Sequence, residues 1–287
     1  MTLAARVPLY ASLLRLDKPI GTLLLLWPTL TALWIASDGV PSAVHLLVFA
    51  LGTFLMRSAG CAINDATDFR FDAQVKRTEV RVVARGLLHP GEAVAVAIVV
   101  AAMAGMLLLL LNLAAFRLAL VALVIAATYP LFKRFFPVPQ LYLGIAFSFG
   151  IPMAFAAVQG VVPPVGWLLF LANLFWVVAY DTQYAMIDRD DDLRLGIHSS
   201  AIFFGRADVA AVMACYGAFL SLLLLVGHAL HADWPFYLGC FFAFVWTLRE
   251  WHLTRSRTRE ACFRAFRDNQ WIGLAVFAGV VANYALR

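Results

Sequence analysis

The sequence predicts an all-α, polytopic membrane protein: about nine transmembrane helices in two four-helix halves plus one, with cytoplasmic helical cap loops. Three observations predict this fold. Of the 287 residues, 63% are hydrophobic and only 14% are charged, whereas about a quarter of a soluble domain is charged. Apolar runs long enough to cross a bilayer follow one another along the chain. Lysines and arginines gather in alternate connections between those runs. We therefore expect a single domain over residues 1–287, embedded in a lipid bilayer.

The chain begins with a segment that is too polar to cross a membrane. Residues 1–18 place Arg6, Arg15 and Lys18 among leucines, which is typical of an amphipathic helix on the membrane surface. The segment lacks the apolar run and the cleavage signal of a secretory signal peptide. From Pro19 onward, the expected spans are 20–37, 43–63, 91–112, 115–132, 139–159, 165–182, 208–229, 234–251 and 270–286.

The distribution of basic residues supports this arrangement. With the amino terminus inside, nine spans place every lysine and arginine on the cytoplasmic side except Arg117 and Arg287. One missing or additional span early in the chain would destroy that asymmetry. The outer connections are short, whereas the inner connections at 64–90 and 183–207 are long and polar. Long connections in compact proteins are usually functional, so we expect these two to be the cytoplasmic catalytic loops.

An acidic motif follows the apolar run 46–63. Asp65, Asp68 and Asp72 stand at i, i+3 and i+7, so they share one face if the helix continues, and Asn64 directly precedes them. Carboxylates gathered at the end of a membrane helix repel one another and are costly to desolvate unless a cation neutralises them. Oxygen ligands suit Mg²⁺, which uses one or two carboxylates together with substrate phosphates. The alternative is a solvated acidic loop.

A second acidic motif follows a later apolar run. Its members share one helical face: Asp181, Tyr184, Asp188 and Asp192. Asp190 and Asp191 point elsewhere and are expected to be solvated. An even number of spans separates the two motifs, so both lie on the cytoplasmic side. Two acidic helix ends that face each other across a bundle can hold two divalent ions around a diphosphate, which is the central hypothesis.

Basic and phenolic side chains on the same side are candidates for substrate binding. They are Arg57, Lys76, Arg77, Arg81, Tyr129, Lys133 and Arg134. Cations beside a diphosphate bind its free oxygens, an arginine through two parallel hydrogen bonds. The alternative for the loop residues is an ion-paired surface helix, and for the pair after Tyr129 a positively charged membrane anchor. Arg57 differs because it lies inside a span, where a cation usually faces the bundle interior and has a partner.

Several function classes find no support. The net charge of +5 is spread over the loops, so no nucleic-acid partner is expected. The four cysteines have no zinc spacing. No obligate protein partner is evident. A cation or metabolite transporter stays a remote alternative, because acidic residues in membranes often mark ion pathways. Transport sites usually lie near the midplane, however, whereas these carboxylates gather at one face beside basic residues.

The residues resemble the UbiA superfamily of intramembrane aromatic prenyltransferases. The motifs that carry the resemblance cover nearly the whole chain: Leu16-Asp17-Lys18-Pro19-Ile20-Gly21, Met56-Arg57-Ser58-Ala59-Gly60-Cys61, Asn64-Asp65-x-x-Asp68-x-x-x-Asp72, Val75-Lys76-Arg77-Thr78, Tyr129-x-x-x-Lys133, Ile151-Pro152-Met153-Ala154-Phe155, Ala179-Tyr180-Asp181-Thr182-Gln183-Tyr184, Asp188-x-x-x-Asp192 and Arg259-Glu260-Ala261-Cys262-Phe263. One departure is Val82-Val83, where the family usually has Pro-Leu. Without that proline we expect the loop to be freer to stay helical.

The resemblance is closest to the branch that prenylates 4-hydroxybenzoate in bacterial ubiquinone biosynthesis. It implies nine transmembrane helices, Mg²⁺ dependence, a polyprenyl diphosphate donor and 4-hydroxybenzoate as acceptor. It also implies a multi-pass protein of the bacterial inner membrane, whose amino terminus and catalytic loops are cytoplasmic. A naphthoate or a haem is the alternative acceptor.

The expected site combines the motifs and the resemblance. Asp68, Asp72, Asp188 and Asp192 are expected to bind Mg²⁺, with Asn64, Asp65 and Asp181 as further or supporting ligands. The predicted partners of the phosphate oxygens are Lys76, Arg77 and Lys133. Arg57 or Arg134 would pair with the benzoate carboxylate. Either Asp181 or the released diphosphate would remove the ring proton.

Overall fold

The computed structural model describes residues 3–132 and 135–287, and every regular element in these ranges is a helix. The elements, in chain order, are α1 (Leu3–Leu13), α2 (Ile20–Ala36), α3 (Ala43–Asp72), α4 (Pro90–Leu107), η1 (Leu108–Leu110), α5 (Leu113–Phe132), α6 (Pro139–Ser148), α7 (Gly150–Gln159), α8 (Pro164–Leu195), α9 (Ser200–Phe204), η2 (Gly205–Ala207), α10 (Asp208–Ala229), α11 (Trp234–Thr254) and α12 (Arg259–Ala285). The predicted all-α fold is confirmed.

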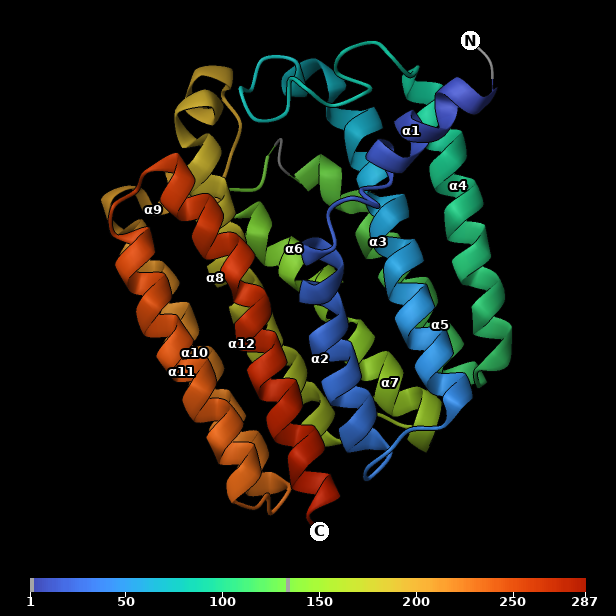
Figure 1. Ribbon diagram of the computed structural model, residues 1–287, viewed down its shortest axis with the longest axis vertical. Coiled ribbons are helices and arrows are strands. Elements are labelled where there is room, and N and C mark those ends of the chain that lie inside the picture. Colours follow the sequence, from blue (N-terminus) through green and yellow to red (C-terminus); the bar gives the residue numbers. More distant parts are fainter. Residues whose placement is uncertain (1–2, 133–134) are drawn as a thin grey trace.

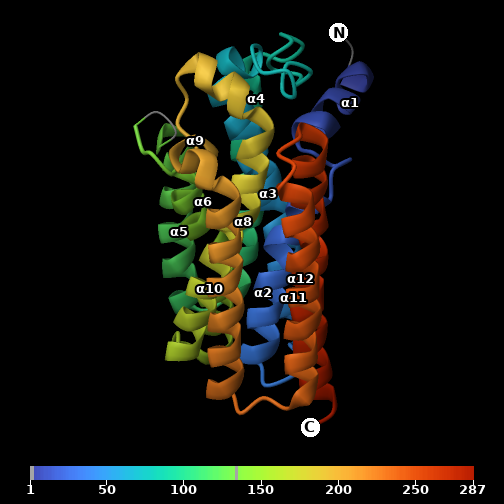
Figure 2. The same cartoon turned by 90° about the vertical axis from the view of Figure 1, so that its left-hand side faces the viewer.

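The long helices run side by side along one axis of the molecule (Figures 1 and 2). Helix α1 and the connections that follow α3 and α8 lie at one end, and the carboxyl terminus lies at the other (Figure 1). Helix α2 packs against α3, α7 and α12, while α8 packs against α6, α10 and α12. The helices that carry the two acidic motifs, α3 and α8, both pack against α7.

The membrane character of the helices is confirmed, whereas the count of nine spans is not. Among the described residues, five helical segments are long and apolar enough to cross a bilayer: Ala43–Asp72, Pro90–Leu110, Pro139–Gln159, Pro164–Leu195 and Ser200–Ala229. Two apolar helices, Ile20–Ala36 and Leu113–Tyr129, are shorter. Helix α11 ends in a segment that contains Arg249 and Glu250, and the first turns of α12 contain several charged residues. These residues lower the average hydropathy of both helices.

The span predicted at 139–159 is divided into α6 and α7 at Phe149. Pro152 has no N–H to donate to the carbonyl of Ser148, and its ring crowds that carbonyl, which explains the break. The hydroxyl of Ser148 bonds back to the carbonyl oxygen of Gly144 at 2.7 Å. The same hydroxyl also accepts a hydrogen bond from Asn173 of α8, at 2.8 Å. The end of α6 is therefore hydrogen-bonded to α8.

Helices α3 and α8 continue well beyond their apolar parts, so both acidic motifs lie on helices. The predicted spans ended at residues 63 and 182, but α3 reaches Asp72 and α8 reaches Leu195. The prediction of a helical cap is wrong for residues 73–89, which form a series of hydrogen-bonded turns. Val82 and Val83 are buried in a small core with Leu13, and this packing holds the segment in its turns.

Helix α1 is fastened to the membrane helices by polar contacts. Arg6 and the hydroxyl of Tyr10 both donate to the carboxylate of Glu92 in the first turn of α4. Arg15 follows α1 and bonds to Asp65 of α3. The amino-terminal segment is therefore docked onto the end of the bundle that holds the acidic motifs.

Candidate active site

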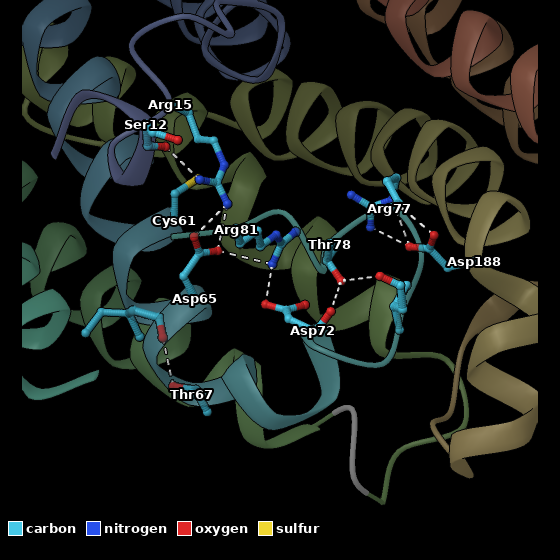
Figure 3. A network of polar contacts seen from close by, with 12 residues as sticks. Ser12, Arg15, Cys61, Asp65, Thr67, Asp72, Arg77, Thr78, Arg81 and Asp188 are labelled. Atoms are coloured by element: carbon cyan, nitrogen blue, oxygen red, sulfur yellow. Dashed lines mark hydrogen bonds and ion pairs between the residues drawn. The ribbon is translucent and has the colours of Figure 1, made fainter. Parts of the chain in front are cut away.

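On the α3 side, two arginines neutralise the buried carboxylates. Asp65 is only 1% exposed, and Nη2 of Arg15 donates to both of its oxygens at 2.7 Å. Nη1 of Arg81 lies 3.1 Å from Asp65 and donates to Asp72 at 2.8 Å (Figure 3). A buried carboxylate without such partners would be strongly destabilising.

On the α8 side, Arg77 binds the second motif. Its Nε lies 3.1 and 3.0 Å from the two oxygens of Asp188, and its Nη2 also bonds to that carboxylate. Its Nη1 donates to the hydroxyl of Tyr184, and the guanidinium carbon lies 4.3 Å from the centre of the Tyr184 ring. This distance is within the range of a cation–π interaction.

The two sides meet through a single loop. Arg77 and Arg81 are four residues apart in the connection after α3, and between them Thr78 bonds to the carbonyl oxygen of Asp72 at 3.0 Å (Figure 3). Burial lowers the pKa of the Arg77 guanidinium, but Tyr184, Asp188 and Asp72 together raise it above its ordinary value. The same guanidinium is therefore within electrostatic reach of both acidic motifs, although they are more than a hundred residues apart in sequence.

The carboxylates of α3 crowd one another. Burial raises the pKa of the Asp72 carboxyl above its ordinary value, against the lowering effect of Arg81. Asp65 and Asp68 raise this pKa further, because each negative charge disfavours the next. A cation that joined this group would relieve the repulsion.

The donor chemistry of the site fits Mg²⁺. The predicted ligands offer carboxylate and amide oxygens, which a hard cation prefers, without sulfur or imidazole. Among the described residues, no three His, Cys, Asp or Glu side chains form a ready metal cluster. Mg²⁺ does not need one, because it commonly binds one or two carboxylates and takes its other ligands from substrate phosphates and water.

The remaining predicted residues differ in their placement. Asn64 and Asp68 lie on α3, Asp181 and Asp192 lie on α8, and all four are half-buried. Lys76 is exposed. Tyr129 lies in the last turn of α5. Lys133 and Arg134 fall outside the described residues.

One expectation about α8 is wrong. Asp191 was expected to be solvated, but it is 2% exposed and bonds to Arg194 and Arg259. Its neighbour Asp190 is exposed, as expected. Asp191 faces the start of α12, and the residue that binds it lies 68 positions away in sequence, so helical spacing alone could not reveal the contact.

Two residues of the network were not predicted to pair with the carboxylates of α3. Arg15 was assigned to the membrane surface, and Arg81 was considered only as one of several loop cations. Their role depends on how α1 and the loop fold over α3, which is not a local property of the sequence. The one available signal is the number of acidic residues: the six carboxylates of the two motifs, in or near a membrane, require neutralising partners.

Arg57 lies deeper in α3 than the acidic motif. It precedes Asp65 by eight residues, or about 12 Å along a helix, and therefore shares its face. Its Nη1 donates to the sulfur of Cys61 one turn later. Thiol sulfur is a weak acceptor, so this hydrogen bond can give way to a ligand that binds the guanidinium more strongly.

The chain is similar to known proteins over nearly its full length. The model of the UbiA prenyltransferase family matches residues 25–278. A Burkholderia mallei protein named 4-hydroxybenzoate octaprenyltransferase is 56% identical over 282 residues, which cover 98% of each chain. A Cupriavidus necator protein of the same name is 57% identical over 282 residues, covering 98% of this chain and 99% of the relative.

Solved structures share the fold. A UbiA homologue from Aeropyrum pernix K1 has a TM-score of 0.79 at 23% identity and covers 91% of this chain and 97% of its own. One from Archaeoglobus fulgidus, solved with GPP and Mg²⁺, has a TM-score of 0.73 at 18% identity, covering 96% of this chain and 99% of its own.

The fold and the site define an enzyme that works inside the membrane. The chain belongs to the UbiA prenyltransferase family, as the resemblance of its motifs implied. It is therefore a prenyltransferase, and the transporter alternative is not retained.

Proposed function

We propose that the chain transfers a polyprenyl group from polyprenyl diphosphate to 4-hydroxybenzoate, at the ring carbon ortho to the hydroxyl, in ubiquinone biosynthesis. The observation that carries this proposal is the joining of the two acidic helix ends by Arg77 and Arg81, which concentrates both signs of charge at one end of the bundle. The names of relatives at 56–57% identity support the substrates.

The diphosphate would bind where the two motifs meet. Asp68, Asp72, Asp188 and Asp192 would hold Mg²⁺, with Asn64, Asp65 and Asp181 in support. Bound Mg²⁺ would supply electrostatic stabilisation of the diphosphate leaving group. Arg77 and Arg81 lie beside the same carboxylates, so they would turn from these to the phosphate oxygens and bind them through paired hydrogen bonds. Lys76 and Lys133 would add charge.

The acceptor would lie deeper, below the diphosphate. Arg57 would pair with the benzoate carboxylate, since it faces the same way as Asp65 about two helical turns below it. The hydroxyl of the acceptor would then point towards the acidic end. Asp181, in the part of α8 that precedes Asp188, is the candidate group on the chain to take the ring proton, and the released diphosphate is the alternative. Tyr129 and Arg134 are further candidate contacts.

The proposal is tested with Asp188→Asn in membranes supplied with polyprenyl diphosphate and 4-hydroxybenzoate. Loss of a carboxylate that would hold Mg²⁺ beside the leaving group should lower kcat by about 10²–10³. Asp190→Asn is the matched control, because Asp190 lies two residues further on the same helix but is exposed. Near-normal turnover of Asp188→Asn in saturating Mg²⁺ would contradict the proposed role.

The acceptor is tested separately. Membranes that contain the chain should prenylate 4-hydroxybenzoate in preference to a dihydroxynaphthoate or a haem. A reversed preference would leave the diphosphate site in place but replace the acceptor.

A further inference from the structure

The first turn of α2 lies directly against the guanidinium of Arg57. A Cβ atom built on Gly21 would lie 2.7 Å from Nε and 2.9 Å from Cζ of Arg57, closer than side-chain atoms approach one another. By contrast, a Cβ on Gly52, five residues before Arg57 in α3, would meet nothing within 4 Å. The missing side chain at position 21 therefore makes the space that the guanidinium occupies.

This contact fixes the guanidinium rather than the fold. The atoms that meet Gly21 belong to the far end of a long, flexible side chain, so a larger residue would displace the guanidinium before it displaced a helix. On its other side, Nη1 of Arg57 bonds to the sulfur of Cys61. Arg57 is thus held between the start of α2 and the next turn of α3.

We infer that Gly21 is a positioning residue for the acceptor: its lack of a side chain lets α2 hold the Arg57 guanidinium in the orientation that binds the acceptor carboxylate. The inference rests on the proposed function, because that function assigns the carboxylate to Arg57. A guanidinium binds a carboxylate well only in a narrow geometry, with two parallel N–H donors facing two oxygens. Displacing it therefore weakens binding even though its charge remains.

The experiment compares Gly21→Ala with the wild-type chain on two acceptors, 4-hydroxybenzoate and the uncharged 4-hydroxybenzamide. Gly21→Ala should raise KM for 4-hydroxybenzoate about tenfold, which corresponds to the loss of one charge-assisted hydrogen bond. KM for 4-hydroxybenzamide and for the polyprenyl diphosphate should stay within about twofold of wild type. Gly52→Ala is the matched control and should leave all three constants unchanged.

A double-mutant cycle identifies the path of the effect. In an Arg57→Ala background, adding Gly21→Ala should change no constant further, since the residue it acts through is gone. An equal rise of KM for both acceptors would overturn the inference, as would an unchanged KM for 4-hydroxybenzoate or a full additional effect in the Arg57→Ala background.

Failure of the proposed function gives a different result. If the wild-type chain prenylated neither acceptor, the assignment of 4-hydroxybenzoate as substrate would be wrong. The role of Gly21 in acceptor binding would then be wrong as well. The contact between Gly21 and Arg57 would still be tested by the thermal unfolding midpoints of four proteins: wild type, the two single variants and the double variant. The change in midpoint caused by Gly21→Ala should then differ between the wild-type and the Arg57→Ala backgrounds, and an equal change in both would show that the two residues do not meet.

Discussion

Neighbouring aspartates on α8 have opposite environments. Asp188 bonds to a loop arginine, Asp190 is exposed, and Asp191 is buried against the start of α12. The hydrogen bond from Arg259 lowers the pKa of the Asp191 carboxyl, and Arg194 acts in the same direction. Because the charged form is favoured in the folded protein, this carboxyl contributes stability above its ordinary pKa of 3.8 and loses that contribution as the pH falls through its lowered pKa.

Replacing the partner of Asp191 tests this linkage. Arg259→Gln should lower the stability of the purified protein by about 1–2 kcal/mol near pH 7, because it removes one hydrogen bond to a charged group while Arg194 remains. The difference from wild type should shrink as the pH is lowered from about 5 to about 3. Thermal unfolding at several pH values measures it. Arg264→Gln, an exposed position of the same helix, is the control; a difference independent of pH would contradict the assignment.

At the scale of elements, α11 and α12 approach each other closely because both crossing points are glycines. A Cβ on Gly239 of α11 would lie 2.7 Å from the carbonyl oxygen of Ala275 and 2.8 Å from Cα of Gly279, both backbone atoms of α12. Backbone cannot move aside as a side-chain tip can. In lipid, helices associate largely through such close packing of small residues.

The change Gly239→Ala should therefore force the two helices apart and cost about 1–3 kcal/mol of stability, despite the better helix propensity of alanine. Gly217→Ala on α10 meets nothing within 4 Å and should be neutral or slightly stabilising. Unfolding midpoints in detergent compare the two variants. A midpoint at or above the wild-type value for Gly239→Ala would show that the crossing has room for a methyl group.

Elements that follow from local spacing could be predicted from the sequence, and those that depend on distant contacts could not. The face shared by Asp65, Asp68 and Asp72 follows from helical periodicity once α3 continues to Asp72. The pairing of Arg81 with that face depends on turns stabilised by the burial of Val82 and Val83. No spacing rule contains that information.

For the whole molecule, the predicted orientation follows from the placement of both acidic helix ends and the amino terminus at one end of the bundle (Figure 1). The strong excess of lysine and arginine there predicts that this end faces the cytoplasm. The exposed residues Glu79 and Val40 lie on either side of the apolar part of α3, and they should therefore face opposite compartments.

Single cysteines test this orientation in a chain whose own cysteines are replaced by serine or alanine. A membrane-impermeant maleimide should label Glu79→Cys only in inside-out vesicles and Val40→Cys only in right-side-out vesicles. The cysteine-free chain is the control for background labelling. The reverse labelling pattern would show that the predicted orientation is wrong and that the proposed diphosphate site faces the outside.

The docking of the amino-terminal segment has a practical consequence for handling the protein. A truncation that began at Pro19 would remove Arg15, which pairs with the buried Asp65, and would leave Arg81 at 3.1 Å from that carboxylate, so shortened expression clones should lose both yield and turnover. The carboxyl terminus lies at the far end of the bundle (Figure 1), and Arg287 there pairs with Asp233 at 3.1 Å. An affinity tag fused after Arg287 through a short spacer would leave the reacting end untouched.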